Sequence, residues 1–280
     1  MIIQEQGDQL ILIRQTDHAV LAGFFARELG NKKFAKPEPL DSFLLAATEH
    51  DNGWQEWELH PTIDPVTFQP YSFMSIPTSE HINLYQRGID RVTDADRYAG
   101  LLVSLHCTEL YDKTRATMPG FSAKTVKTNE SNQVNEFLQK LRLQQLRLKV
   151  DLRADAWKKD AADEKAVRMN SKRLEAVDRL SLYFCMSPME PAMIEAVPTD
   201  DHDGEVDWEL EPVGKSAVTI APYPFRREPL EISILARKVP KRRYADSSDF
   251  QKTLSLAPFF GMNFTLRDRE ARTRAMAVGI

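Results

Sequence analysis

Histidine and aspartate side chains lie on the inward-facing side of segments that have the periodicity of helices. His18 shares a helical face with Leu21 and Phe25. His50 ends a second apolar stripe, which begins near Phe43, and it is followed directly by Asp51. Burying imidazole and carboxylate groups costs free energy unless they are paired or bound to a metal. The sequence therefore predicts a helical scaffold that encloses a metal-binding centre.

Three later residues extend this pattern. Asp178 shares a helical face with Leu182, and His106 follows the apolar run GLLVSL. His81 lies near the start of another predicted helix. In chain order, the candidate metal ligands are His18, His50, Asp51, His81, His106 and Asp178.

The chain divides into a helical part and a later part with the alternation of strands. Helical spacing of apolar residues predicts helices at about residues 16–29, 41–51, 79–91, 94–111, 129–157 and 163–185. Thr16 and Asp17 offer N-cap side chains to the first of these helices. The first 15 residues predict a β-hairpin around Gly7, and short alternating runs after Pro188 predict further strands.

We therefore expect a mainly α domain over residues 1–196, the hairpin included, and a β-rich region over residues 197–280 packed on it. The first hairpin is a candidate to join the later sheet. The segment between Trp54 and His81 is rich in proline and aromatic residues, which favours a long loop that covers a pocket.

Composition narrows the classes of partner. A net charge of -4 gives no electrostatic basis for binding nucleic acid, and no run of 18 apolar residues predicts a membrane span. Two cysteines, Cys107 and Cys185, are too few for a disulfide framework, so we expect a cytoplasmic protein. The amphipathic segment 129–157 suits either core packing or the face of a homodimer.

The segments EHDNGW and VDRL, with a histidine upstream, give the chain a resemblance to the HD-domain metalloprotein superfamily. The resemblance covers about residues 16–185. It implies an HD-domain-like helical bundle in which His18, His50, Asp51 and Asp178 bind a metal. The chain departs from the usual pattern at Asn52, where an apolar residue is common.

Imidazole and carboxylate ligands together suit one or two divalent transition-metal ions, namely iron, manganese, zinc, cobalt or nickel. Some HD proteins bind a second ion through two further histidines, and His81 and His106 are the candidates by order. With both, Asp51 would bridge two ions; with neither, the site would be mononuclear.

A closer resemblance rests on the segments QTDHA, EHDNGW, LLVSLH, VDRLSL and PYPF. Together they look like a bacterial family of uncharacterised proteins. Membership of such a family would support an HD-like fold and would supply no activity.

Three functions follow from these resemblances. The first is a metal-dependent phosphohydrolase acting on a small phosphorylated substrate, in which Asp51 or Glu49 steers the attacking water. The second is a dinuclear-iron oxygenase acting on a small polar molecule, which needs both His81 and His106. The third is a non-catalytic, metal-stabilised binding or sensor protein.

Substrate-binding candidates lie on both sides of the histidines. Trp54 and Trp57 follow the His-Asp pair and could line a substrate pocket, although core packing is the ordinary role of such residues. Lys113 and Arg115 follow the His106 segment and could meet a phosphate group, although a surface role is the ordinary alternative.

Overall fold

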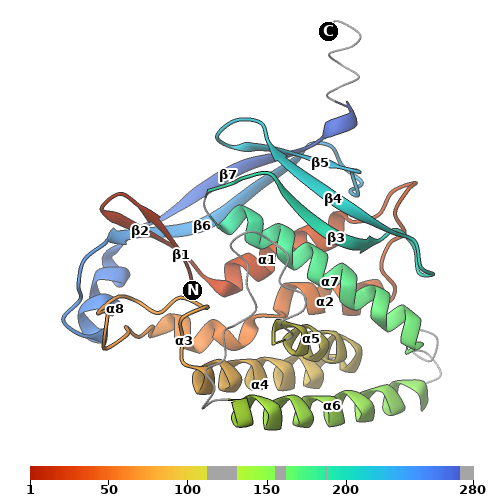
Figure 1. The fold of residues 1–280 in the computed structure, drawn as a ribbon, viewed down its shortest axis with the longest axis horizontal. Coiled ribbons are helices and arrows are strands. Elements are labelled where there is room, and N and C mark those ends of the chain that lie inside the picture. Colours follow the sequence, from red (N-terminus) through yellow and green to blue (C-terminus); the bar gives the residue numbers. More distant parts are fainter. Residues whose placement is uncertain (112–130, 155–161, 187, 272–280) are drawn as a thin grey trace, which may run out of the picture.

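Seven strands form one curled sheet that lies across a set of helices (Figure 1). The computed structural model describes residues 1–111, 131–154, 162–186 and 188–271. The strands are β1 (Ile2–Gln6), β2 (Gln9–Ile13), β3 (Ala192–Pro198), β4 (Glu205–Pro212), β5 (Ala217–Ala221), β6 (Leu230–Pro240) and β7 (Phe259–Asp268). Their order across the sheet is β1-β2-β6-β7-β5-β4-β3.

The predicted N-terminal hairpin is confirmed. Gly7 has a φ of 61° at the first turn position, which is the requirement of a type II′ turn. Strand β2 then pairs antiparallel with β6, so the hairpin extends the sheet made by the later strands. The boundary predicted between residues 196 and 197 stays a prediction; it falls inside β3, and the sheet contains strands from both sides of it.

Each of the six predicted helices is present. The helical elements of the described residues are α1 (Gln15–Glu28), α2 (Leu40–Glu49), η1 (Asn52–Trp54), α3 (Gln55–Leu59), α4 (Thr78–Ala95), α5 (Arg97–Leu110), α6 (Ser131–Ala154), α7 (Glu164–Cys185) and α8 (Ser247–Leu256). The fold is therefore mixed α+β, as a helical domain with a β-rich region implies, whereas the HD-domain-like bundle stays a prediction. Within the described ranges, no helix has both the length and the apolar character that crossing a membrane requires.

Two helices differ from the expectation. Helix α3 lies in the segment expected to be a loop. Helix α8 interrupts the β region, where Asp246 caps it by accepting a hydrogen bond from the Asp249 backbone nitrogen and where Phe250 and Leu254 are buried. Its short apolar face of two residues explains why periodicity gave no signal.

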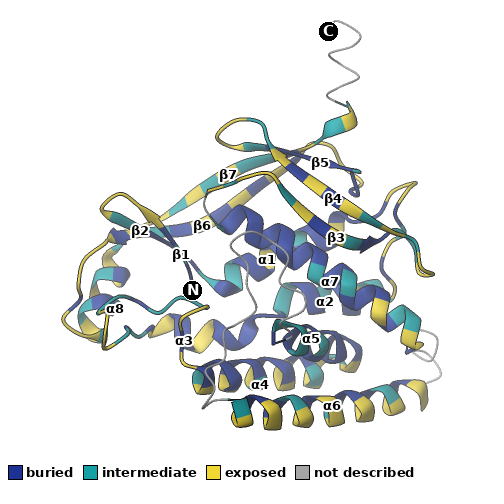
Figure 2. Cartoon of the chain, in the orientation of Figure 1, coloured by how far each residue is buried: buried dark blue, intermediate teal, exposed yellow. Residues whose placement is uncertain are grey.

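Helices α1 and α7 lie directly beneath the sheet, and their residues are mostly buried (Figure 2). Helix α6 lies farthest from the sheet and buries one side only (Figure 2). That buried side accounts for its amphipathic pattern, and Leu143, Leu146 and Val150 remain exposed on α6. The homodimer stays a prediction. Buried candidate ligands lie on α1 (His18), at the end of α2 (His50), on α5 (His106) and on α7 (Asp178), and these four helices pack together.

Candidate metal centre

The first turn of α1 is held by a carboxylate from α3. Glu58 Oε1 accepts a hydrogen bond of 2.6 Å from the Gln15 backbone nitrogen, and Glu58 Oε2 accepts one of 3.3 Å from the Thr16 hydroxyl. The predicted N-cap by Thr16 and Asp17 is wrong, because the Asp17 carboxylate binds the Arg14 guanidinium instead. Glu58 thereby satisfies helix-end N–H groups that the local sequence leaves unpaired.

Four potential ligand atoms meet where α1, the end of α2 and α7 come together. His18 Nε2 lies 3.1 Å from Asp51 Oδ2 and 3.4 Å from Asp178 Oδ1. His50 Nε2 lies 3.2 Å from Asp178 Oδ1 and 3.7 Å from Asp51 Oδ2, and the two Nε2 atoms are 3.2 Å apart. Ligand atoms bound at about 2.1 Å lie about 3.0 Å apart in an octahedral site and about 3.4 Å apart in a tetrahedral one. The distance between the two imidazole nitrogens, and the distances from each of them to the two carboxylate oxygens, are therefore close to those between ligands of one metal ion.

Hydrogen bonds at the far side of each ring select the tautomers. His50 Nδ1 donates to the Ala47 carbonyl at 2.9 Å. The Ser181 hydroxyl donates to the Asp178 carbonyl at 2.8 Å, so its oxygen accepts from His18 Nδ1 at 2.7 Å. In the neutral rings both Nε2 atoms then direct lone pairs toward the centre. Two lone pairs facing each other at 3.2 Å repel unless a cation lies between them.

The electrostatics of the centre also favour a cation. His18, His50, Asp51 and Asp178 are each 1–3 % exposed. Burial opposes the charged form of His50, but Asp51 and Asp178 outweigh it and raise the pKa of His50 to about 9. Burial likewise opposes the charge on Asp51, yet His50 and His18 hold the pKa of that carboxyl below its usual range. Without a metal, a proton on His50 takes the place of the cation.

His106 from α5 lies beside this set. One ligand atom from each of His50, His106 and Asp178 falls within 4.8 Å of the others, as happens also for His18, His50 and Asp51. The His106 ring meets the His50 ring edge-on, with centroids 5.0 Å apart. Burial, its largest influence, lowers the pKa of His106 to about 4, so its imidazole is neutral.

His81 belongs to neither of the two groups found among the described residues. It is buried on α4, and its Nδ1 lies 2.6 Å from the Tyr111 hydroxyl. Its ring packs on the Tyr85 ring, with centroids 4.6 Å apart. The role of His81 as a ligand stays a prediction.

Tyr85 and Gln15 hold Asp51 in place, and the sequence did not predict this role for either residue. The Tyr85 hydroxyl donates to Asp51 Oδ1 at 2.7 Å, and the Gln15 amide donates to Asp51 Oδ2 at 3.0 Å. Burial and Asp51 raise the pKa of Tyr85 well above its usual value, so its hydroxyl keeps its proton. The available signal was spacing: Tyr85 is four residues after His81 and shares its helical face.

A comparison with known protein families matches a region of the chain that includes all the candidate metal ligands. The model of a family described as "Protein of unknown function (DUF3891)" matches residues 1–241. The chain belongs to the DUF3891 family. Neither the curated proteins nor the solved structures include a match. The expected membership of a family of unknown function is confirmed, and the family match itself carries no link to the HD superfamily.

In this DUF3891 chain, Gly53 lets the segment after the His-Asp pair touch α4. A Cβ on Gly53 would lie 2.0 Å from the Leu84 carbonyl oxygen, closer than any side chain can approach backbone. Arg91 on α4 reinforces the contact through hydrogen bonds of 3.2 Å from Nη1 to the Asn52 carbonyl and side-chain oxygens. Gly53, the glycine of EHDNGW, thus allows the close contact with α4 that fixes the position of Asp51.

The remaining predicted site residues lie at the margin of the centre. Glu49 is half-buried and outside both ligand groups, and burial raises the pKa of its carboxyl. Trp54 and Trp57 are buried with ring centroids 5.7 Å apart. The Trp54 ring also lies 6.0 Å from the His81 ring. Lys113 and Arg115 lie outside the described residues. Their roles in catalysis and substrate binding stay predictions.

Proposed function

We propose that this DUF3891 protein is a metal-dependent phosphohydrolase with a mononuclear centre held by His18, His50, Asp51 and Asp178. One observation carries the proposal: two imidazole Nε2 atoms lie 3.1–3.7 Å from each other and from two carboxylate oxygens, while the Nδ1 atom of each ring is hydrogen-bonded elsewhere. The order His, His-Asp, Asp along the chain is the ligand order of the HD superfamily, which supports the same assignment.

A divalent transition metal bound here would supply Lewis acidity, which lowers the pKa of water and polarises a phosphoryl oxygen. Asp51 is held in place from two sides by Tyr85 and Gln15, so its Oδ2 keeps its orientation toward the centre. His106 is neutral beside His50 and Asp178. Its imidazole is the group available to accept a proton from an attacking water.

The surroundings of Asp51 support one ion rather than two. A second ion bridged by Asp51 would need Oδ1, which accepts the Tyr85 hydroxyl. It would also need His81, which belongs to neither of the two ligand groups found among the described residues. Both observations favour a mononuclear hydrolase over a dinuclear-iron oxygenase.

Metal content tests the centre. Protein purified without chelator is expected to contain one iron, manganese, zinc, cobalt or nickel ion per chain by elemental analysis. His18→Ala and Asp178→Asn should lose the ion. His81→Ala should keep it, as should the matched control His202→Ala, which changes an exposed histidine. Two ions in the wild type, with one lost in His81→Ala, would contradict the mononuclear centre.

Activity tests the hydrolase. Metal-loaded protein is expected to release phosphate from p-nitrophenyl phosphate, and His18→Ala should be inactive with the same metals. His106→Ala should keep the ion and lose about 100-fold or more in kcat, because proton transfer by a positioned group contributes 10²–10⁴-fold. One ion per chain without hydrolysis of any phosphoester would instead support the metal-stabilised binding protein.

A further inference from the structure

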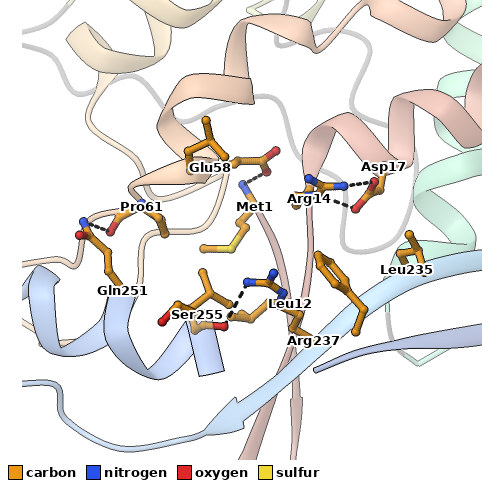
Figure 3. A pocket seen from close by; sticks show the side chains of 13 residues that line it. Met1, Leu12, Arg14, Asp17, Glu58, Pro61, Leu235, Arg237, Gln251 and Ser255 are labelled. Atoms are coloured by element: carbon orange, nitrogen blue, oxygen red, sulfur yellow. Dashed lines mark hydrogen bonds and ion pairs between the residues drawn. The ribbon is translucent and has the colours of Figure 1, made fainter. Parts of the chain in front are cut away.

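A cavity lies where the start of α1 meets the sheet and α8 (Figure 3). It has a volume of about 120 Å³ and is bounded by residues from β2, β6, α8 and the segment after α3. Its polar lining includes Arg14, Asp17, Glu58 and Arg237. The His and Asp residues of the metal centre are absent from its wall.

Arg237 is the group in this cavity whose bonding is incomplete. Its Nη1 donates to the Leu254 carbonyl at 3.1 Å, and its guanidinium lies over the Phe259 ring at 3.9 Å from the centroid. Its Nε is buried without an acceptor, and no carboxylate pairs with Arg237 within the described part of the chain. Burial and the neighbouring Arg14 lower the pKa of Arg237, and the attraction of Asp17 offsets them only in part. An anion in the cavity would complete the bonding of this guanidinium.

The carboxylates of the cavity are already engaged. Asp17 accepts two hydrogen bonds from Arg14, at 2.7 and 2.8 Å (Figure 3). Glu58 accepts the Gln15 backbone nitrogen and lies 3.3 Å from the Met1 nitrogen. Arg14 is thus neutralised by Asp17, whereas Arg237 is not, so the cavity keeps an excess positive charge beside Arg237.

The rest of the wall is apolar and restricts the class of anion. Leu12, Pro61, Leu235, Leu254 and Phe259 line the cavity around the guanidinium. A fully hydrated inorganic anion gains nothing from such a wall, whereas an apolar body gains from leaving water. A closed cavity of about 150 Å³ is large enough for benzene. This cavity, at about 120 Å³, is somewhat smaller but is partly open to solvent, so it takes an apolar group of about six carbon atoms if part of that group stays at the mouth.

We propose that this cavity binds a small organic carboxylate, with the carboxylate on Arg237 and the apolar body against Leu12 and Leu254. The planar guanidinium suits a carboxylate because two parallel N–H groups can meet two oxygens. The site is separate from the metal centre, so the proposal stands whether or not the chain is a phosphohydrolase.

Calorimetry with benzoate on the protein as purified, with its metal retained, tests the proposal. We expect saturable binding in the wild type and affinity about 10- to 100-fold lower in Arg237→Gln, because the variant removes a charge-assisted hydrogen bond. Arg243→Gln is the matched control: Arg243 also stacks on a phenyl ring, 4.2 Å from the Phe68 centroid, and lies outside the cavity wall. Its affinity for benzoate should equal that of the wild type.

A second variant covers the case in which Arg237→Gln fails to fold. Ser255 is an exposed residue of the cavity wall, and Ser255→Trp should exclude benzoate while the circular dichroism spectrum stays that of the wild type. Benzyl alcohol should bind at least tenfold more weakly than benzoate, and inorganic phosphate should not displace benzoate. Absence of saturable benzoate binding, equal loss in Arg243→Gln, or preference for phosphate or the alcohol would each overturn the proposal.

Discussion

Two of the buried charged residues of helix α7, Arg173 and Asp178, lie in networks of opposite character. Around Arg173, donors meet acceptors: Nη1 donates to Asn170 Oδ1 at 2.9 Å and lies 2.7 Å from Asp201 Oδ1. Its Nη2 donates to the Asp200 carbonyl at 2.8 Å. Only Nε lacks an acceptor among the described residues. The protein itself nearly completes this network.

Around Asp178, the neighbouring groups are hydrogen-bond acceptors, as the carboxylate itself is. Its Oδ1 faces the Nε2 atoms of His18 and His50 at 3.4 and 3.2 Å, and the hydrogen bonds at Nδ1 leave those atoms without protons in the neutral rings. The comparison teaches that burial of charge alone does not identify a binding site. What identifies it is a surplus of acceptors that no side chain satisfies.

Removal of the metal should give the largest difference between the two networks, because only the Asp178 network should bind the ion. A ligand at about 1,000 times its Kd stabilises the folded state by about 4 kcal/mol, so chelation should lower the free energy of unfolding by about that amount. Denaturant titration with and without EDTA measures it. Asp178→Asn should show no response to EDTA, whereas Asp201→Asn should respond like the wild type. An EDTA response that survives in Asp178→Asn would place the ion elsewhere.

The pH dependence of the metal-free protein should be the next largest effect. The pKa of His50 rises from 6.5 to about 9 on folding, so its contribution is fully present below pH 6.5 and is lost as the pH rises through 9. The pKa of His106 falls to about 4, so its contribution is lost as the pH falls from 6.5 toward 4. Metal-free stability should therefore peak near pH 6.5.

Chemical denaturation at pH 5, 6.5, 8 and 9 measures this profile. The alkaline decline should be on the order of 3 kcal/mol, at 1.36 kcal/mol per pKa unit. Saturating metal should abolish it, because the ion replaces the proton on His50. A metal-free protein equally stable at pH 6.5 and 9 would show that His50 carries no extra proton.

Loss of a single tyrosine hydroxyl can be compared between the two networks, with Tyr85→Phe in one and Tyr98→Phe in the other. Tyr85 donates to Asp51, and Tyr98 accepts from the Asn170 amide at 2.8 Å. Loss of the Tyr85 hydroxyl should weaken metal binding about 10- to 100-fold, as removal of a partner of a metal ligand commonly does. Tyr98→Phe should leave metal affinity unchanged. Competition with a chromogenic chelator measures both, and equal affinities in the two variants would refute the positioning role of Tyr85.

The smallest expected effect on stability comes from a change in the Arg173 network. Asp201→Asn should lower the free energy of unfolding by about 1–2 kcal/mol, because Asp201 is half exposed while Arg173 is buried. Thermal denaturation of the metal-loaded protein measures the change, and elemental analysis should find the full metal content. Metal loss in this variant would mean that the two networks on α7 are coupled.

Local periodicity was sufficient to predict most of the helical part. Because His18, His50, His106 and Asp178 lie on stripes with apolar residues, spacing alone indicated that they face inward, and each is buried. Spacing could not show which of His81 and His106 lies within reach of the other ligand atoms, since both are buried and only the packing of their helices differs.

Contacts between segments far apart in the chain could not be predicted from local sequence patterns. Glu58 caps α1 from 43 residues away, and no local pattern distinguishes it from a solvent-exposed glutamate. The Tyr85 bond to Asp51 spans 34 residues and depends on how α4 packs against η1. The pairing of β2 with β6 and the parallel pairing of β5 with β7 depend on the arrangement of the whole sheet.

The pairing of β2 with β6 also has a consequence for how the chain is synthesised. Leu230, where β6 begins, follows Ile13, where β2 ends, by 217 residues. At about 5–20 residues per second, the ribosome needs roughly 10–40 s to produce the strand that covers the edge of β2. During that time the hairpin presents unpaired backbone groups and the apolar residues Leu10 and Leu12, a surface prone to aggregation. Nascent chains of this family should therefore depend on chaperones until β6 has emerged.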